Sequence, residues 1–354
     1  MRQQKRTPSA SHNKWLALGV LFLVLFPSPL TGQIAGLGTY TLLGRPTTAR
    51  SAALGMNLLA LHSTDPTIAL DNPSLLTPAM AHTFTLSYIS LPASTYAGDI
   101  AYIHQTKHLG PIIFNLKYNT TGRIDQYDEE DNNIGTFSAS DYVLNIGWGL
   151  PIDSNFSIGV NFKPAISQYA EYTAAAIAID IAGTYVSNSH NFATTLMARN
   201  IGSQIKPFSE TMEELPFELL WTLSYKLNRA PFRLFFTANE LQKWNLRYDD
   251  PLHPTTQVDP FTGEETSEPW IEGVVDNLMR HTLFGVEAEL GKSLTFSVGY
   301  SYRQSAEMIG ADIINLSGFS FGATVRTKRF DIIYARHNYH LSQASNYFSI
   351  TYRL

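Results

Sequence analysis

Residues 294–303 read Leu-Thr-Phe-Ser-Val-Gly-Tyr-Ser-Tyr-Arg, and this stretch decides the fold class. Every second residue is apolar or aromatic, and most of the residues between them are small or polar. A period of two is typical of a β-strand, because successive side chains point to opposite faces of a sheet, whereas a helix repeats about every 3.6 residues. The stretch is therefore predicted to be a strand with one bulky face and one small, polar face.

The same alternation recurs along most of the chain from residue 83 onward, which predicts fourteen strands. Most of them are about ten to fourteen residues long, whereas strands in soluble proteins peak at about five or six. A tilted strand of about ten residues is long enough to cross the hydrocarbon core of a bilayer. The predicted strands are 83–91, 96–106, 109–119, 137–150, 154–167, 174–187, 189–202, 215–228, 230–242, 281–291, 292–304, 314–327, 328–337 and 345–354.

The connections between these strands alternate between longer and very short, and the longest is the ninth, at about 243–280. Transmembrane barrels have short turns on the periplasmic rim, longer loops outside, and an even number of strands. In lipid every backbone N–H and C=O needs an internal partner, so a membrane sheet must close on itself. We predict an all-β fold, a 14-stranded antiparallel transmembrane β-barrel whose bulky face meets lipid and whose small, polar face lines the lumen.

Composition excludes several other classes of protein. Charged residues make up only 16% of the chain, below the roughly 25% of soluble domains. The chain has no cysteine, which excludes a disulfide framework, a cysteine metal site and a thiol nucleophile. The formal net charge of -5 argues against a nucleic-acid partner, because no basic stripe is available for phosphates.

The first 32 residues are predicted to be an export signal that is removed from the mature protein. Basic residues without an acid are followed by an apolar run at 15–26 and then by prolines and small residues. That run is too short for a spanning helix, which needs about 20 apolar residues. We expect the protein to reach the outer membrane of a Gram-negative cell.

Residues 33–82 match no membrane strand and are predicted to be a plug segment inside the barrel. Fourteen strands spaced about 4.8 Å and tilted about 40° give a backbone diameter of roughly 28 Å, which is too wide for wall side chains alone to fill the inside. Residues 49–61 are predicted to form a short helix, which turns at Pro66 and Pro73 follow. A periplasmic extension is the alternative for this segment. The predicted plan is a signal peptide (1–32), a plug (33–82) and a barrel (83–354).

The ninth connection is the strongest candidate for a functional surface. Loops of this length in compact folds are usually functional. Pro251 and Pro260 mark an extended segment, and residues 270–279 are predicted to form a short helix. Exposed Trp270 and Ile271 beside polar residues suit a protein contact. A lid folded over the barrel is the alternative.

Other motifs give no credible catalytic, metal or cofactor site, so we expect a non-enzymatic protein without a cofactor. The pattern Gly-x-Ser-x-Gly at 318–322 lies inside an alternating strand, whereas a nucleophile elbow needs a sharp turn from strand to helix. The acidic third connection, with Asp128 and Glu129, lacks the ligand order of a calcium loop. A solvated acidic loop is favoured, and these two residues are further candidates for partner binding.

Several short motifs resemble the PorV/PorQ family, a branch of the fatty-acid-transporter-like (FadL-like) outer-membrane barrels. The plug carries Ala49-Arg50-Ser51-Ala52-Ala53-Leu54-Gly55 and then Asn72-Pro73-Ser74, which are similar to two signatures of that family. The resemblance spans the mature chain, and further matching stretches lie at 135–142, 199–202, 215–217, 230–233, 280–281 and 285–287.

This resemblance implies a subunit of the type IX secretion system of Bacteroidota that works at the cell surface. It implies anchoring of a PorZ-like surface protein through the extracellular loops, together with PorU and PorV in an attachment complex that links cargo to lipopolysaccharide. The alternative is a transporter of hydrophobic small molecules, as in the wider barrel superfamily. A transporter is expected to have an apolar path through its plug, whereas the lumen of a scaffold can be sealed.

Overall fold

The computed structural model describes residues 40–55, 58–91, 95–247, 256–258, 265–267, 269–307, 316–338 and 344–354. The predicted signal peptide lies outside these residues.

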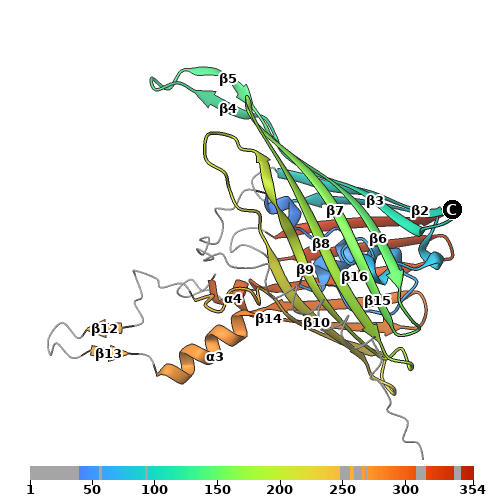
Figure 1. Cartoon of the computed structure of the whole chain (residues 1–354). Helices are drawn as coiled ribbons and strands as arrows, with labels where there is room; N and C mark the ends of the chain where they lie inside the picture. The colour runs from blue at the N-terminus through green and yellow to red at the C-terminus, as the bar shows by residue number, and fades with distance from the viewer. Residues whose placement is uncertain are drawn as a thin grey trace, which may run out of the picture. The chain divides into compact units, whose positions relative to one another are not determined.

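Fourteen antiparallel strands close into a barrel in which each strand pairs with its neighbours along the chain and the last pairs with the first (Figure 1). This confirms the predicted architecture. The barrel strands are β1 (Thr83–Ser90), β2 (Thr95–Thr106), β3 (Gly110–Thr121), β6 (Ala139–Pro151), β7 (Phe156–Tyr169), β8 (Tyr172–Val186), β9 (Phe192–Lys206), β10 (Glu218–Lys226), β11 (Phe232–Ala238), β14 (Thr282–Leu290), β15 (Leu294–Ser301), β16 (Phe319–Arg326), β17 (Phe330–His337) and β18 (Ser345–Arg353).

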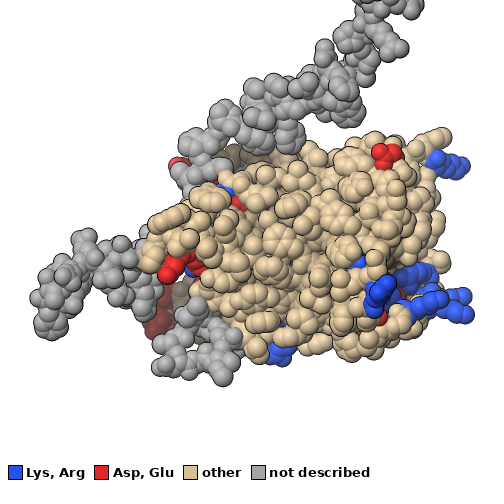
Figure 2. Space-filling view, turned by 90° about the horizontal axis from the view of Figure 1, so that it is seen from below, with Lys and Arg blue, Asp and Glu red and all other residues tan. Residues whose placement is uncertain are grey.

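The two faces of the wall follow the alternation of the sequence. Along β15, Thr295 and Ser297 are buried while Phe296 and Val298 are exposed on the outside. Figure 2 shows one side of the barrel as a surface almost free of charged residues, which gather toward its two ends. The outward apolar side chains form what we call the lipid-facing band, which includes Phe232, Leu234, Phe284, Val286, Phe296 and Val298.

The short-turn rim carries turns such as 291–293 and 327–329, and the long-loop rim carries the additional secondary structure. Two hairpins, β4 (Ile124–Tyr127) with β5 (Asn133–Phe137) and β12 (Thr256–Val258) with β13 (Glu265–Ser267), extend the long loops. Two helices, α3 (Trp270–Arg280) and α4 (Tyr302–Glu307), also belong to this rim. No helix in the described ranges is long and apolar enough to cross a bilayer.

Several strand ends differ from the predicted bounds: β9 continues to Lys206 instead of ending at 202, β11 ends at Ala238 instead of 242, and β16 begins at Phe319 instead of 314. At the end of β15 the kind of element also differs. The alternation predicts a strand over 292–304, but β15 stops at Ser301 and the chain turns into α4. Arg303 forms ion pairs with Glu307 on its own helix and with Glu240 on the neighbouring connection. These contacts favour a helical turn, and the alternation cannot reveal them because Tyr302 and Arg303 continue its pattern.

The plug occupies the lumen, as the sequence predicts. Its elements are η1 (Thr41–Leu43), α2 (Ala49–Ala53), η2 (Pro66–Ile68), η3 (Pro73–Leu75) and η4 (Pro78–Met80), and nearly all of their residues are buried. The predicted helix over 49–61 is wrong in length, because Gly55 takes a positive φ of 77° just after α2. Thr48 caps the start of α2 by accepting a hydrogen bond from the Ser51 N–H.

Glycines in the wall let the plug backbone approach closely at two places. A Cβ atom at Gly159 would lie 2.1 Å from the Ser74 nitrogen, and one at Gly149 would lie 2.2 Å from the Pro73 oxygen. On the β15 side, a Cβ atom at Gly299 would lie 2.3 Å from the Gly55 nitrogen. Since no other residue type fits such spaces, the plug is fixed to the wall at both places.

Candidate functional site at the long-loop rim

The connection between β11 and β14 begins with a segment that His281 holds in place. The Asn239 N–H donates to the His281 carbonyl oxygen at 2.9 Å. In return, the His281 ring places Nδ1 2.8 Å from the Asn239 carbonyl oxygen and Nε2 3.0 Å from that of Trp244. His281 therefore joins the end of α3 to the segment that presents Trp244.

Helix α3 is packed through its polar face. Asn277 is only 5% exposed; its side-chain amide donates to the Trp244 carbonyl oxygen at 2.6 Å and accepts from the Leu246 N–H at 2.9 Å. The opposite side, which we call the apolar face of α3, is exposed. Its residues are Trp270, Ile271, Val274, Val275 and Leu278.

A cluster around Asp276 fixes the rotation of the helix about its axis. The carboxylate lies 2.8 Å from Nε of Arg280 and 3.2 Å from Nε of Arg247, and it accepts a 2.9 Å hydrogen bond from the Tyr302 hydroxyl on α4. Burial raises the pKa of Tyr302, and the hydrogen bond to Asp276 raises it further. The polar contacts of Asp276 and Asn277 together require the apolar face of α3 to point away from the rim.

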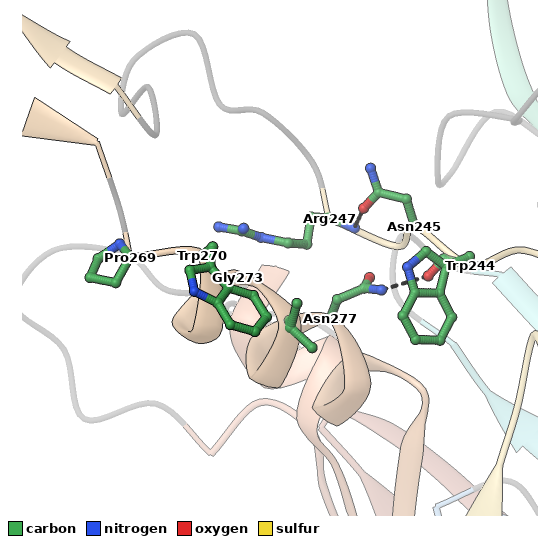
Figure 3. Close-up of a pocket in the computed structure, with 8 residues that line it drawn as sticks. Trp244, Asn245, Arg247, Pro269, Trp270, Gly273 and Asn277 are labelled. Carbon is green, nitrogen blue, oxygen red and sulfur yellow. Dashed lines mark hydrogen bonds between the residues drawn. The ribbon is translucent and has the colours of Figure 1, made fainter. Parts of the chain in front are cut away.

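Between α3 and the segment 244–247 lies a groove of about 260 Å³, which we call the tryptophan groove (Figure 3). The side chains of Trp244 and Trp270 lie toward opposite ends of it, and Arg247 extends along one side. Trp244 is 67% exposed and Trp270 is 78% exposed, so large aromatic surfaces are open to a ligand. The remaining lining comes from Asn245, Pro269, Gly273, Val274 and Asn277.

A second hollow of about 550 Å³ lies on another flank of α3. Ile271 and Val275 line it together with Arg247, Glu272, Asp276 and Tyr302. Three of these side chains carry formal charges and they include no tryptophan. The tryptophan groove differs from it in offering two aromatic side chains to a ligand.

The residues predicted to bind a partner do not gather in one place. Trp270 and Ile271 lie on the exposed face of α3, whereas Pro251 and Pro260 lie outside the described residues. Asp128 and Glu129 belong to the turn of the β4–β5 hairpin, between β3 and β6, and four strands separate β6 from β11 in the barrel. Backbone and side-chain hydrogen bonds from Asn132 hold the pKa of Asp128 below its usual range.

Sequence reasoning missed Trp244, Arg247, Asn277 and His281. Helical spacing does not single out Asn277, because it lies seven residues after Trp270 and three after Val274 and lines the same groove as both. The contact of Trp244 with Asn277 joins residues 33 positions apart, and no local pattern encodes it.

The lumen is the second candidate site, and in the described residues its contacts are polar and close. Arg50 in the plug is bound by Glu287 on the wall and by Asp65 in the plug. Arg45 lies 3.1 Å from the Asp99 carboxylate, and the Lys117 ammonium donates to the Arg45 carbonyl oxygen at 2.7 Å. No group of His, Asp and Glu within the described ranges has the arrangement of a metal site.

The closed wall, the lipid-facing band and the luminal plug define a transmembrane β-barrel of the plugged class. Its fold is similar to that of the toluene transporter TodX from Pseudomonas putida, with a TM-score of 0.50, 10% identity, and coverage of 87% of this chain and 98% of that one. The toluene transporter TbuX from Ralstonia pickettii (TM-score 0.48, 11% identity) is covered over its whole length by 89% of this chain. A FadL homologue from Pseudomonas aeruginosa gives a TM-score of 0.44 at 10% identity, over 87% of this chain and 98% of that one.

At such low identity these similarities concern the fold alone. The argument from the fold rests on TodX, which has the highest TM-score of the three. No protein-family model and no curated protein sequence matches the chain.

Proposed function

We propose that this protein is a non-enzymatic barrel of the outer membrane that captures small hydrophobic compounds at its external rim. The tryptophan groove is the observation that carries the proposal. The likeness in fold to a toluene transporter supports it, and the comparisons favour transport over the anchoring role that the sequence resemblance implies.

The groove has the chemistry of a site for single-ring compounds. Ligand pockets for drug-sized molecules measure about 300–1,000 Å³, and this groove, at about 260 Å³, is slightly smaller. The indole rings of Trp244 and Trp270 offer faces and edges to which an aromatic ring can stack. Arg247, which is paired with Asp276, also lines the groove and places a guanidinium group near an anionic substituent of a bound aromatic compound.

Ligand binding to the purified full-length barrel tests the proposal. Isothermal titration with toluene and with benzoate should give binding to the wild type that Trp244→Ala and Trp270→Ala each weaken. Arg247→Gln should weaken benzoate more than toluene. The matched control is Trp221→Ala, because Trp221 is an exposed tryptophan on β10 that does not line the groove. Equal affinity in the wild type and in the double tryptophan variant would reject the groove as the capture site.

Anchoring of a surface protein is the second candidate function, and the fixed plug favours it. The close contacts at Gly149, Gly159 and Gly299 support a lumen that stays closed, which a scaffold tolerates. In this function the protein would be a PorQ-like subunit of a type IX secretion system, with a PorZ-like protein held at its loops. PorU and PorV would complete the attachment complex, and the signal peptide at 1–32 would direct export.

A pull-down from mild detergent separates the two functions. The tagged full-length protein should retain its surface partner, and deletion of residues 251–276 should release it while the barrel stays folded. Deletion of residues 125–133, in the β4–β5 region, is the control, because it shortens a different long loop of the same rim. If both deletions retain every co-purifying protein and the groove variants alter hydrocarbon binding, the transport function stands alone.

A further inference from the structure

Helix α3 has the reverse of the orientation expected at the surface of a soluble protein. A helix in water usually buries its apolar side and exposes its polar side. Here the buried residue is Asn277, whereas Val275 and Leu278 are 53% and 46% exposed. An exposed apolar face of this kind indicates a contact with something apolar.

Polar contacts with other residues of the rim hold α3 in this reversed orientation. Asn277 makes two hydrogen bonds with the backbone at Trp244 and Leu246, and Asp276 contacts Arg247 and Tyr302. A rotation that buried the apolar face would break all four contacts. The orientation of α3 therefore follows from specific polar contacts, and these contacts keep the apolar face outward.

Helix α3 is adjacent along the chain to a strand of the lipid-facing band. The helix ends at Arg280, and only His281 separates it from β14, whose outward side chains Phe284 and Val286 belong to that band. Eleven residues of helix span about 16 Å. Figure 1 shows α3 (orange) extending from the end of β14 at this rim.

Its residues also fit the boundary between lipid and water. Tryptophan is enriched at membrane interfaces, because its ring is apolar while its N–H is polar. Trp270 lies at the first turn of α3, and Trp244 lies beside the helix. Helices that lie in the interface combine an apolar side with a strongly polar one.

We propose that the apolar face of α3 lies in the outer leaflet of the bilayer, as an interfacial anchor beside the barrel wall. The acyl chains and headgroup boundary of the lipid then cover Ile271, Val275 and Leu278. The tryptophan groove opens at the same level, so compounds dissolved in the leaflet reach it without crossing water. The lipid contact itself does not depend on what the groove binds.

The absence of native cysteines makes a direct test possible. Val275→Cys and Leu278→Cys are labelled with an environment-sensitive fluorophore in the full-length protein and reconstituted into phosphatidylcholine vesicles. Phe284→Cys on the lipid-facing band is the reference for lipid, and Glu129→Cys on the β4–β5 hairpin is the reference for water. Quenching is measured with lipids that carry a nitroxide near the headgroup and with iodide in solution. Heat-modifiable migration confirms that each variant is folded.

The labels at Val275 and Leu278 should show a blue-shifted emission, quenching by nitroxide lipid comparable to that at Phe284, and loss of the iodide quenching seen at Glu129. Iodide quenching equal to that at Glu129 would overturn the proposal, because the face would then be in water. Protection from both quenchers would also overturn it, because protein would then cover the face. Loss of toluene binding in the groove variants, with lipid quenching intact, would reject the proposed function and leave this contact standing.

Discussion

The guanidinium group of Arg50 in the plug donates two parallel hydrogen bonds, each 2.7 Å long, to the carboxylate of Glu287 on the barrel wall. A third hydrogen bond of 2.6 Å joins it to Asp65. All three side chains are almost completely buried. Removing one partner of such a buried pair is costly, because loss of Arg50 leaves Glu287 without its counter-ion and Asp65 with Arg326 alone.

Arg50→Ala should therefore lower the free energy of unfolding by about 3–5 kcal/mol. Lys226→Ala is the control, because Lys226 pairs with Glu289 where both side chains are partly exposed, and such pairs contribute about 0–1 kcal/mol. Urea unfolding of the refolded barrel, followed by heat-modifiable migration, gives both values. Similar losses in the two variants would mean that Arg50 does not hold the plug.

Stability should depend on pH through Asp65. Burial alone would raise its pKa, but Arg50 and Arg326 outweigh burial and hold the pKa of Asp65 below its usual range. A depressed folded pKa stabilises the fold above the unfolded value of about 3.9, and this contribution is lost as the pH falls through the folded pKa. Wild type should be more stable than Asp65→Asn at neutral pH, and the difference should shrink below about pH 4. A difference that stays constant down to the lowest pH would contradict this assignment.

Gly159→Ala should displace the plug, because the added Cβ would lie 2.1 Å from the Ser74 nitrogen. Overpacking of this kind costs about 1–3 kcal/mol. Gly183→Ala is the matched control, since its Cβ would lie at an ordinary 3.5 Å from the Phe156 ring. Protease protection of the plug, measured beside urea unfolding, should fall only in the first variant. Equal protection in both would show that the plug can shift at little cost.

Arginine in the lipid-facing band should destabilise the barrel. Val298→Arg places a charge on a side chain position that is 40% exposed and surrounded by Phe284, Val286 and Phe296, at a cost of about 2–4 kcal/mol near the bilayer midplane. Val298→Leu should cost little. The comparison is made by urea unfolding in vesicles, and equal tolerance of both changes would remove the lipid assignment of this face.

The rims should differ in access from outside the cell. Glu129→Cys, on the β4–β5 hairpin, should react with a membrane-impermeant maleimide on intact cells. Asp153→Cys, in the turn between β6 and β7, should react only after the cells are opened. The reason is that long loops face outward in barrels of this kind. Labelling of Asp153→Cys alone would reverse the orientation.

Most of the wall could be predicted because every strand in a bilayer follows the same alternation. Apolar side chains face lipid, and small or polar side chains face the lumen. Val298 faces lipid and Ser297 faces the lumen, so the alternation in the sequence predicts the side of the wall on which each side chain lies. The end of β15 could not be predicted, because Tyr302 and Arg303 continue the alternation and only contacts with distant residues turn them into α4.

The candidate site could be predicted only in part. Trp270 and Ile271 stand out in the sequence as apolar residues in a long polar loop, and both are exposed in the structure. The tryptophan groove also requires Trp244, which Asn277 and His281 position from the far end of the same connection. These residues are far apart in the sequence and meet only in the folded protein, so the spacing of residues in the sequence does not predict their contacts. For the same reason the partner of Arg50, 237 residues away, could not be named.

The last strand holds the first part of the chain. The Ala49 N–H in α2 donates to the Ser349 hydroxyl on β18 at 2.9 Å, and the same hydroxyl lies 2.8 Å from that of Ser87 across the pairing of β1 with β18. Closure of the cylinder and seating of the plug therefore share one residue, so we expect the two steps to be coupled during folding. Contacts this distant in sequence are slow to form. We therefore expect disruption of β18 near Ser349 to disturb the plug as well as the wall.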